Sequence, residues 1–309
     1  QLAPFAPLLV ARSMHVIETV GGEVVAFEEA ARAAKERNED LSKFSYAAGG
    51  APNQTLLVTA LELIGSVVGA LGDAVAQELL DAELPAALVY VADSAYDVRM
   101  AAFGVLGELV QHAPDVARDA IEPMAPLMVK NIQPFFRRLC ANACWALGEV
   151  ALLIQSDMDA LVETILERVL PLLDNVHTQS MSVTESACVL LGRLGIHSAE
   201  AMSPHIDAVL NVLPAWCTIM RMSEASREKE TAFIGLCVLC EQHPQQVAPL
   251  LGHVCDAIAG WHRAPPELHE RFSSMLHGFA QSFGEASWNE FAAQFPPDVR
   301  SVLHDVYGL

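Results

Sequence analysis

Residues 103–110 read FGVLGELV and residues 144–151 read CWALGEVA, and each places a glycine inside an apolar, helix-like segment. The same arrangement recurs in LELIGSVV (61–68), CVLLGRLG (188–195), AFIGLCVL (232–239) and SMLHGFAQ (274–281). The glycines stand 42, 41, 44, 43 and 43 residues apart, at Gly65, Gly107, Gly148, Gly192, Gly235 and Gly278. The chain is therefore built from one unit repeated at a nearly constant interval.

A period of about 40–47 residues is typical of HEAT and armadillo arrays, in which helix pairs stack and bury their apolar faces against their neighbours. The repeat predicts an all-α fold, an α-solenoid of about seven antiparallel HEAT helix pairs with a concave inner face. We expect residues 1–309 to form a single array, with the polar, Gly- and Pro-bearing residues 35–53 as an inter-helix loop. The first residues read as mid-helix without a starting Met, so we expect a fragment of a longer protein.

Local signals refine this expectation. Residues 1–34 read as helix with a break at Gly21-Gly22, and residues 74–92 read as one amphipathic first helix of a pair. Asp97 is expected to cap the following helix, and Arg99 to reach an acid in a neighbouring unit.

The composition limits the partners. The formal net charge is −20 and 52% of the residues are hydrophobic. Strong acidity disfavours nucleic acid, which requires Lys and Arg, and favours a basic partner. The simpler alternative is that the acids only keep an apolar chain soluble. The longest apolar run, 56–72, carries Glu62 and lies on the repeat, so we expect no membrane span.

No enzyme signature is recognised. The seven cysteines are scattered, and the C-x-x-C of Cys237 and Cys240 lies in an apolar helical stretch without a second pair at zinc spacing. Buried structural thiols are therefore expected there. Neither a histidine pair with a third ligand nor a G-x-S-x-G or phosphate-loop motif occurs. We expect no catalysis, no metal and no cofactor.

Because the units are alike, residues seven and three before each glycine and one after it share a helical stripe. The stripe reads Val58, Glu62, Ser66, then Met100, Gly104, Glu108, then Ala141, Trp145, Glu149, then Glu185, Val189, Arg193. A buried stripe would be uniformly apolar, so this one predicts an exposed inner face that binds an extended peptide with Lys or Arg and apolar side chains. Trp145 would be its rigid anchor. The alternatives are a core role for Trp145 and plain solvation for the acids.

Four segments carry a family resemblance: LCANACWALGEVAL (139–152), TESACVLLGRLG (184–195), LPAWCTIMRMSEASREKETAFIGLC (213–237) and WNEFAAQFPPDVRSVLHDVYGL (288–309). They resemble the C-terminal end of the transportin, or karyopherin-β2, family of nuclear import receptors. The resemblance covers nearly the whole chain and is weakest in the first fifty residues. It implies a receptor fragment that binds nuclear localisation signals on its concave face.

The resemblance also implies individual contacts. In that family the matching region holds the basic or apolar N-terminal part of Pro-Tyr signals. Trp145, Asn142, Glu62, Glu108 and Val189 match cargo-facing positions, and the stripe adds Glu149 and Glu185 as candidates. The sequence departs from the family pattern at three positions: Gly69 replaces an acid, Arg137 replaces an apolar contact residue and would favour an acid on the partner, and Ala141 replaces an asparagine.

The remaining expectations concern the whole receptor. The resemblance implies Ran-GTP and nucleoporins as partners through regions that precede this sequence, and shuttling between cytoplasm and nucleus. The alternative function is a HEAT-repeat scaffold subunit that organises a multiprotein complex. A scaffold would not need a stripe of acids and a tryptophan.

Overall fold

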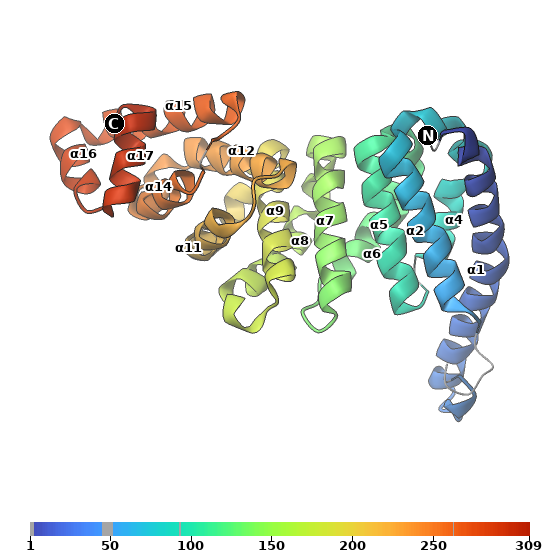
Figure 1. Ribbon diagram of the computed structural model, residues 1–309. Helices are drawn as coiled ribbons and strands as arrows, with labels where there is room; N and C mark the ends of the chain where they lie inside the picture. The colour runs from blue at the N-terminus through green and yellow to red at the C-terminus, as the bar shows by residue number, and fades with distance from the viewer. Residues whose placement is uncertain (1–2, 45–51, 93, 262) are drawn as a thin grey trace. The chain divides into compact units, whose positions relative to one another are not determined.

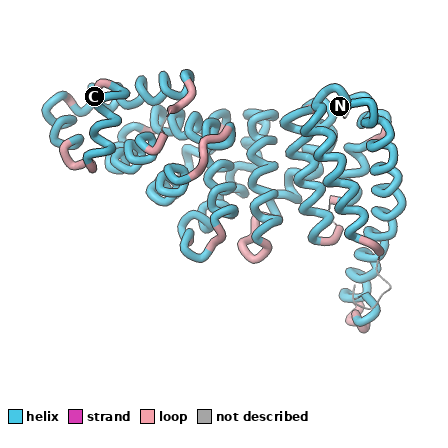
Figure 2. Tube along the Cα trace, in the orientation of Figure 1, coloured by secondary structure: helices cyan, strands magenta, loops and turns pink. Residues whose placement is uncertain are grey.

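The computed structural model describes residues 3–44, 52–92, 94–261 and 263–309, and within them it contains helices and no strand (Figure 2). The α-helices are α1 (Ala6–Glu36), α2 (Gln54–Leu71), α3 (Ala76–Asp81), α4 (Leu84–Val91), α5 (Tyr96–His112), α6 (Pro114–Lys130), α7 (Arg137–Ile154), α8 (Asp159–Asp174), α9 (Met181–His197), α10 (Ala199–Met202), α11 (Ile206–Met222), α12 (Arg227–Gln242), α13 (Pro244–Val247), α14 (Leu251–Ala259), α15 (Pro266–Phe283), α16 (Glu285–Ala292) and α17 (Pro297–Tyr307). Short 3-10 turns join several of them.

The helices group into two compact units, Gln1–Leu153 and Ile154–Leu309, called unit 1 and unit 2 below. In unit 1, α2 packs against α1 and α5, while α4 packs against α1 and α6 behind them (Figure 1). In unit 2, α12 packs against α9 and α15, while α11 packs against α8 and α14. Each unit therefore has two layers of helices, as the predicted stack of antiparallel pairs requires.

The six glycines of the repeat lie in six different helices: α2, α5, α7, α9, α12 and α15. Two glycines of α9 explain the tightest packing. A Cβ built on Gly192 would lie 2.7 Å from the Cα of Ala232, and one on Gly195 would lie 2.7 Å from the carbonyl oxygen of Gly235. The backbones of α9 and α12 thus touch, which only residues without side chains permit.

Two sequence expectations about helix boundaries are wrong. α1 runs unbroken through Gly21-Gly22, because Gly21 serves close packing: its Cβ would lie 3.1 Å from Cγ1 of Val91 on α4. The single helix expected over 74–92 is instead a 3-10 turn, α3 and α4, and Glu83 at the joint adopts a left-handed conformation with φ of +54°. The predicted loop 35–53 begins two residues later than expected, because α1 continues to Glu36. Residues 45–51 of this segment lie outside the described residues.

The Asp97 and Arg99 expectations also need correction. Asp97 lies inside the first turn of α5, whose N-cap position is Ala95 without a side-chain cap. Arg99 reaches an amide and not an acid, since its Nη1 donates to Oδ1 of Asn131 at 3.2 Å. Asn131 follows α6, so the bond still links consecutive helices of unit 1.

Several residues that carried the family resemblance tie unit 2 together. The indole Nε1 of Trp216 on α11 donates to the backbone oxygen of Cys188 on α9 at 2.8 Å. Arg221 on α11 pairs with Asp256 on α14, and its Nη2 lies 3.2 Å from Oδ2 of Asp298 on α17. Trp216 thus connects the two helix layers of unit 2 and Arg221 connects successive helices of one layer, so their part in the motif is structural.

By length and composition alone, segments 54–81 and 137–174 are apolar enough to cross a membrane. α2, which makes up most of the first segment, buries Leu57, Leu61 and Ile64 completely or nearly so and packs against α1 and α5. An apolar core helix of a stacked array passes the same test, so the apolarity is explained by packing.

Candidate functional site

Trp145 on α7 lies against the backbone of α5 in unit 1. A Cβ built on Gly107 would lie 2.6 Å from Cη2 and 2.8 Å from Cε3 of the indole, so the ring occupies the space that any other residue would need. Trp145 keeps partial exposure. It is therefore neither a fully buried core residue nor a free surface residue, but a ring seated on a glycine with part of its surface accessible.

Asn142, one turn before Trp145, fixes the same pair of helices. Its Nδ2 donates to the backbone oxygen of Met100 on α5 at 3.2 Å, and it lies 3.8 Å from the Cβ position of Gly104. Asn142 is half-buried and its amide nitrogen is already bonded. It therefore holds α7 in register with α5 and positions Trp145, whatever contact its carbonyl makes with a partner.

Glu108 on α5 lies between the two neighbouring helices of its layer. Its Oε2 would lie 3.0 Å from a Cβ on Gly69 of α2, and its Cγ lies 3.9 Å from the Cβ position of Gly65. Partial burial raises the pKa of the Glu108 carboxyl; nearby His112 opposes this, and the charge of Glu149 on α7 adds to it. His112 Nε2 lies 3.6 Å from Glu108 Oε2, and about a third of the Glu108 side chain is exposed.

The place of Glu108 explains one departure from the family pattern. The carboxylate lies over Gly69, where the resemblance leads us to expect an acid. A side chain at position 69 would have to displace the carboxylate, and two acids there would repel each other. At the α2–α5 junction, this sequence thus has the Glu108 carboxylate alone, where the family pattern has an acid at position 69 as well.

Glu62 is exposed on α2, the helix that Glu108 overhangs, and forms no ion pair among the described residues. Arg137 is exposed and begins α7. Two exposed phenylalanines, which the sequence did not indicate, precede Arg137. Phe135 is 86% exposed. The ring of Phe136 packs against that of Tyr96, with their centroids 5.4 Å apart. Unit 1 therefore brings together Glu62, Glu108, Asn142 and Trp145 along α2, α5 and α7.

The stripe is not exposed throughout, contrary to expectation. Met100 and Glu149 in unit 1 are buried, with 6% and 1% exposure, and so are Val189 and Arg193 in unit 2, with 5% and 0%. α9 packs against α8, α11 and α12, which leaves little room for an open face there. Equal offsets from the glycine thus do not guarantee equal exposure.

Glu185 has a neighbour inside unit 2 that sequence reasoning missed. Lys229 on α12 is buried, with its Nζ 2.9 Å from the backbone oxygen of Ser223 and 4.6 Å from the centroid of the Trp261 ring. Burial lowers the pKa of the Lys229 ammonium, and the charge of Glu185 opposes that shift. Glu185 therefore compensates a buried cation of its own unit. In the sequence, Lys229 stands out only as part of segment 213–237, which carries the family resemblance.

Comparison with known proteins agrees with the sequence resemblance. No family model matches the chain. It is 27% identical to human Transportin-1 over 261 residues, which are 84% of this chain and 28% of that protein. It is 28% identical to transportin of Dictyostelium discoideum over 258 residues, 83% of this chain and 27% of that protein. It is 28% identical to importin subunit beta-2 of Schizosaccharomyces pombe over 264 residues, 84% of this chain and 28% of that protein.

Solved structures support the fold. A designed armadillo repeat protein matches with a TM-score of 0.57 at 19% identity, covering 74% of this chain and 95% of the other. Another, solved in complex with the peptide (KR)4, matches with a TM-score of 0.54 at 19% identity, again over 74% and 95% of the two chains. The chain spans a little over a quarter of the relatives it matches. Over that part of their length, this helical-repeat chain is similar in sequence to transportin and importin beta-2 proteins.

Proposed function

We propose that this chain is part of a nuclear import receptor and that unit 1 binds the basic or apolar N-terminal portion of a Pro-Tyr nuclear localisation signal. The peptide lies extended across α2, α5 and α7. Its cations pair with Glu62 and Glu108, and an apolar side chain packs on the accessible part of Trp145. No catalytic step is involved.

The observation that carries the proposal is the packing of the Trp145 ring on Gly107, the residue next to Glu108. An indole held on a backbone loses little rotamer freedom on binding, which is what makes rigid aromatic residues effective anchors. Among the described residues, the partly exposed Glu108 carboxylate pairs only with the His112 imidazole, at 3.6 Å, and burial raises its pKa, so a cation from a partner would stabilise its charged form. The chemistry of the surface thus matches a ligand with cationic and apolar side chains.

The comparisons add two arguments of different weight. The relatives are named transportin and importin, which indicates carriage of other proteins as the general role. The designed repeat protein solved with (KR)4 has a similar helical architecture and a strongly basic peptide ligand, as this chain's net charge of −20 would also favour. In the full receptor, Ran-GTP and nucleoporins would be further partners and the location would alternate between cytoplasm and nucleus.

The test is a titration of a fluorescent peptide with alternating Arg and Leu residues against wild-type protein and Trp145→Ala. Loss of a hot-spot tryptophan costs about 2 kcal/mol or more, which is about a thirtyfold rise in Kd. The matched control is Tyr90→Ala, because Tyr90 is 55% exposed on α4, in the other helix layer. Equal affinity of Trp145→Ala and wild type, with both proteins folded, would remove the proposed role of the indole.

A second pair of variants isolates the charges. Glu108→Gln should weaken binding and reduce its dependence on salt, because one ion pair is lost. Glu122→Gln, an exposed acid on α6 in the other layer, should leave both quantities unchanged. If the two glutamine variants behave alike, the attraction comes from the overall charge of the chain and not from this surface.

A further inference from the structure

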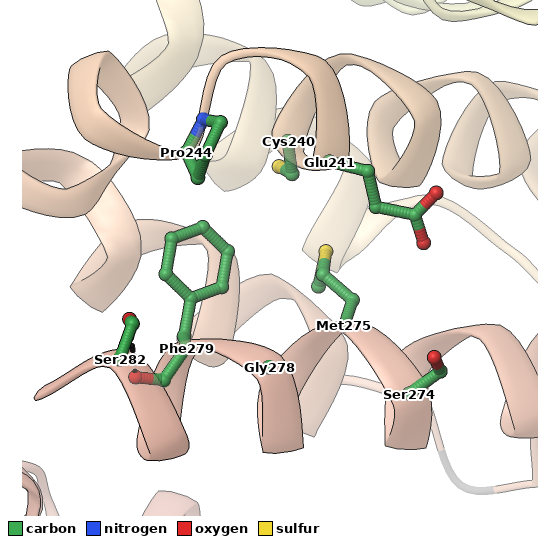
Figure 3. Close-up of a pocket in the computed structure, with 8 residues that line it drawn as sticks. All are labelled: Cys240, Glu241, Pro244, Ser274, Met275, Gly278, Phe279 and Ser282. Carbon is green, nitrogen blue, oxygen red and sulfur yellow. Dashed lines mark hydrogen bonds between the residues drawn. The ribbon is translucent and has the colours of Figure 1, made fainter. Parts of the chain in front are cut away.

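A cavity of about 350 Å³ lies between α12 and α15 in unit 2 (Figure 3). Its lining is mostly apolar and comes from Cys240, Glu241 and Pro244 on one side and from Ser274, Met275, Gly278, Phe279 and Ser282 on the other. Cavities of about 150 Å³ with apolar walls already admit a benzene ring. This cavity therefore has room for a large aliphatic or aromatic side chain.

The last glycine of the repeat keeps the cavity open. A Cβ built on Gly278 would meet nothing within 4 Å, whereas Gly192 and Gly235 on the neighbouring helices lie in direct backbone contact. The same repeat position thus lies in close backbone contact at Gly192 and Gly235, between α9 and α12, but borders a cavity at Gly278, between α12 and α15. The apolar lining is open to solvent, so a ligand side chain that covered it would remove apolar surface from water.

The two ends of the cavity differ in chemistry. At one end the Phe279 ring faces Pro244, while at the other the Glu241 carboxylate and the Ser274 hydroxyl lie at the opening (Figure 3). Glu241 is exposed and forms no ion pair among the described residues; Arg271 on α15 pairs instead with Glu267, at 3.4 Å. An apolar floor with a free carboxylate at its rim suits a ligand that joins an apolar group to a cation.

We propose that this cavity is a second peptide subsite, which takes an apolar side chain of an extended segment while an adjacent Lys or Arg of the segment pairs with Glu241. The class of ligand rests on the proposed function, since both sites would bind basic and apolar side chains. The occupant is a peptide because an apolar side chain next to a Lys or Arg matches the apolar lining and the exposed Glu241 carboxylate at its rim. Met275 and Phe279, 4% and 5% exposed, supply its apolar wall.

The test uses the whole chain carrying Trp145→Ala, so that the surface of unit 1 contributes little. The probe is a fluorescent Arg-Leu-Arg-Leu-Arg peptide, and its comparison is the (KR)4 sequence, which lacks an apolar side chain. Gly278→Leu fills the cavity, and Gly278→Ala is the matched control that adds one methyl group to the same helix position. Both replace a poor helix former in α15, so both variants should fold at least as well as the parent.

We expect Gly278→Leu to lower the affinity for the Leu-containing peptide at least tenfold and Gly278→Ala to change it less than twofold. Glu241→Gln should weaken both peptides and reduce the salt dependence. A benzophenone side chain in place of the central Leu should cross-link to Met275 or Phe279. Unchanged affinity of Gly278→Leu, or cross-links elsewhere, would overturn the subsite.

The two proposals fail separately in this design. If Trp145→Ala weakens binding in the wild-type background but Gly278→Leu does not, unit 1 binds the signal and the cavity has no part in it. If Gly278→Leu weakens binding and Trp145→Ala does not, the cavity is a peptide site and the proposed role of Trp145 is refuted. A loss of binding in both variants supports both sites.

Discussion

Replacing Gly107 by alanine is the most direct test of how Trp145 is held. The added methyl carbon would lie 2.6 Å from Cη2 and 2.8 Å from Cε3 of the indole, well inside the van der Waals contact of two carbons. Something must therefore move, and the side chain of Trp145 yields more readily than two helix backbones. We expect the ring to leave its seat and Asn142 to remain bonded to Met100.

The magnitude follows from a comparison within unit 1. Overpacking of this kind costs about 1–3 kcal/mol, while alanine in place of a helical glycine contributes about 1 kcal/mol of stabilisation. Gly22→Ala on α1 receives the same helix gain without the clash, since its Cβ would meet nothing within 4 Å. The difference between the two variants in free energy of unfolding should then equal the overpacking term, about 1–3 kcal/mol.

The assay combines urea unfolding with 19F NMR of protein labelled with fluorotryptophan. Trp145 is the single tryptophan of unit 1, the others being Trp216, Trp261 and Trp288, so Trp145→Phe assigns its resonance. Gly107→Ala should shift that resonance, leave the other three in place and weaken peptide binding to about the level of Trp145→Ala. An unshifted resonance together with stability equal to that of Gly22→Ala would refute the seat on Gly107.

Three further predictions concern charge, packing and thiols. Burial and the charge of Glu149 raise the pKa of Glu108, and a bound cation would lower it again. Affinity for a basic peptide should therefore be highest above the raised pKa and fall as pH drops through it. Fluorescence titrations of wild type and Glu108→Gln across the acidic range check this, and identical pH profiles would contradict it. Gly235→Ala should lower the free energy of unfolding by about 3 kcal/mol, because the added methyl group meets the backbone of Gly192 and not a movable side chain. Calorimetry of this variant and of Gly278→Ala measures the difference, and equal melting temperatures would disprove the contact. All seven cysteines are buried, and burial raises the pKa of Cys237 and Cys255 to about 12, so Ellman's reagent should react with the thiols only on unfolding; rapid labelling of Cys237 or Cys255 in native protein would contradict the packing.

The repeat was predictable because a period of about 43 residues and a glycine in each apolar helix are properties of the chain itself. Every glycine of the set falls in the expected helix. Helix breaks were less predictable: Gly21-Gly22 continues α1, whereas Glu83 breaks the segment 74–92 with a left-handed residue. A glycine in a helix can mean an end or a close contact, and only the neighbouring helix, here through Val91, decides between them.

The helices that carry the candidate residues were predictable, and the contacts of those residues were not. Counting from the glycines placed Glu62, Glu108 and Trp145 on one face, and the structure brings them to α2, α5 and α7. It did not indicate that Glu108 overhangs Gly69, because that depends on the distance between helices. Nor did it indicate that Val189 is buried, since exposure depends on what packs outside the helix and not on the helix's own period.

The contact between Gly192 and Gly235 has a mechanical consequence. Two helices whose backbones touch cannot slide or tilt without atomic overlap, so α9 and α12 should respond to load as one stiff element. At the α12–α15 junction side chains such as Phe233 and Phe272 make the contact, and the 350 Å³ cavity beside them leaves side chains space to shift. Between these two junctions, elastic deformation should therefore be larger on the Gly278 side, and a side chain bound in the cavity would reduce it.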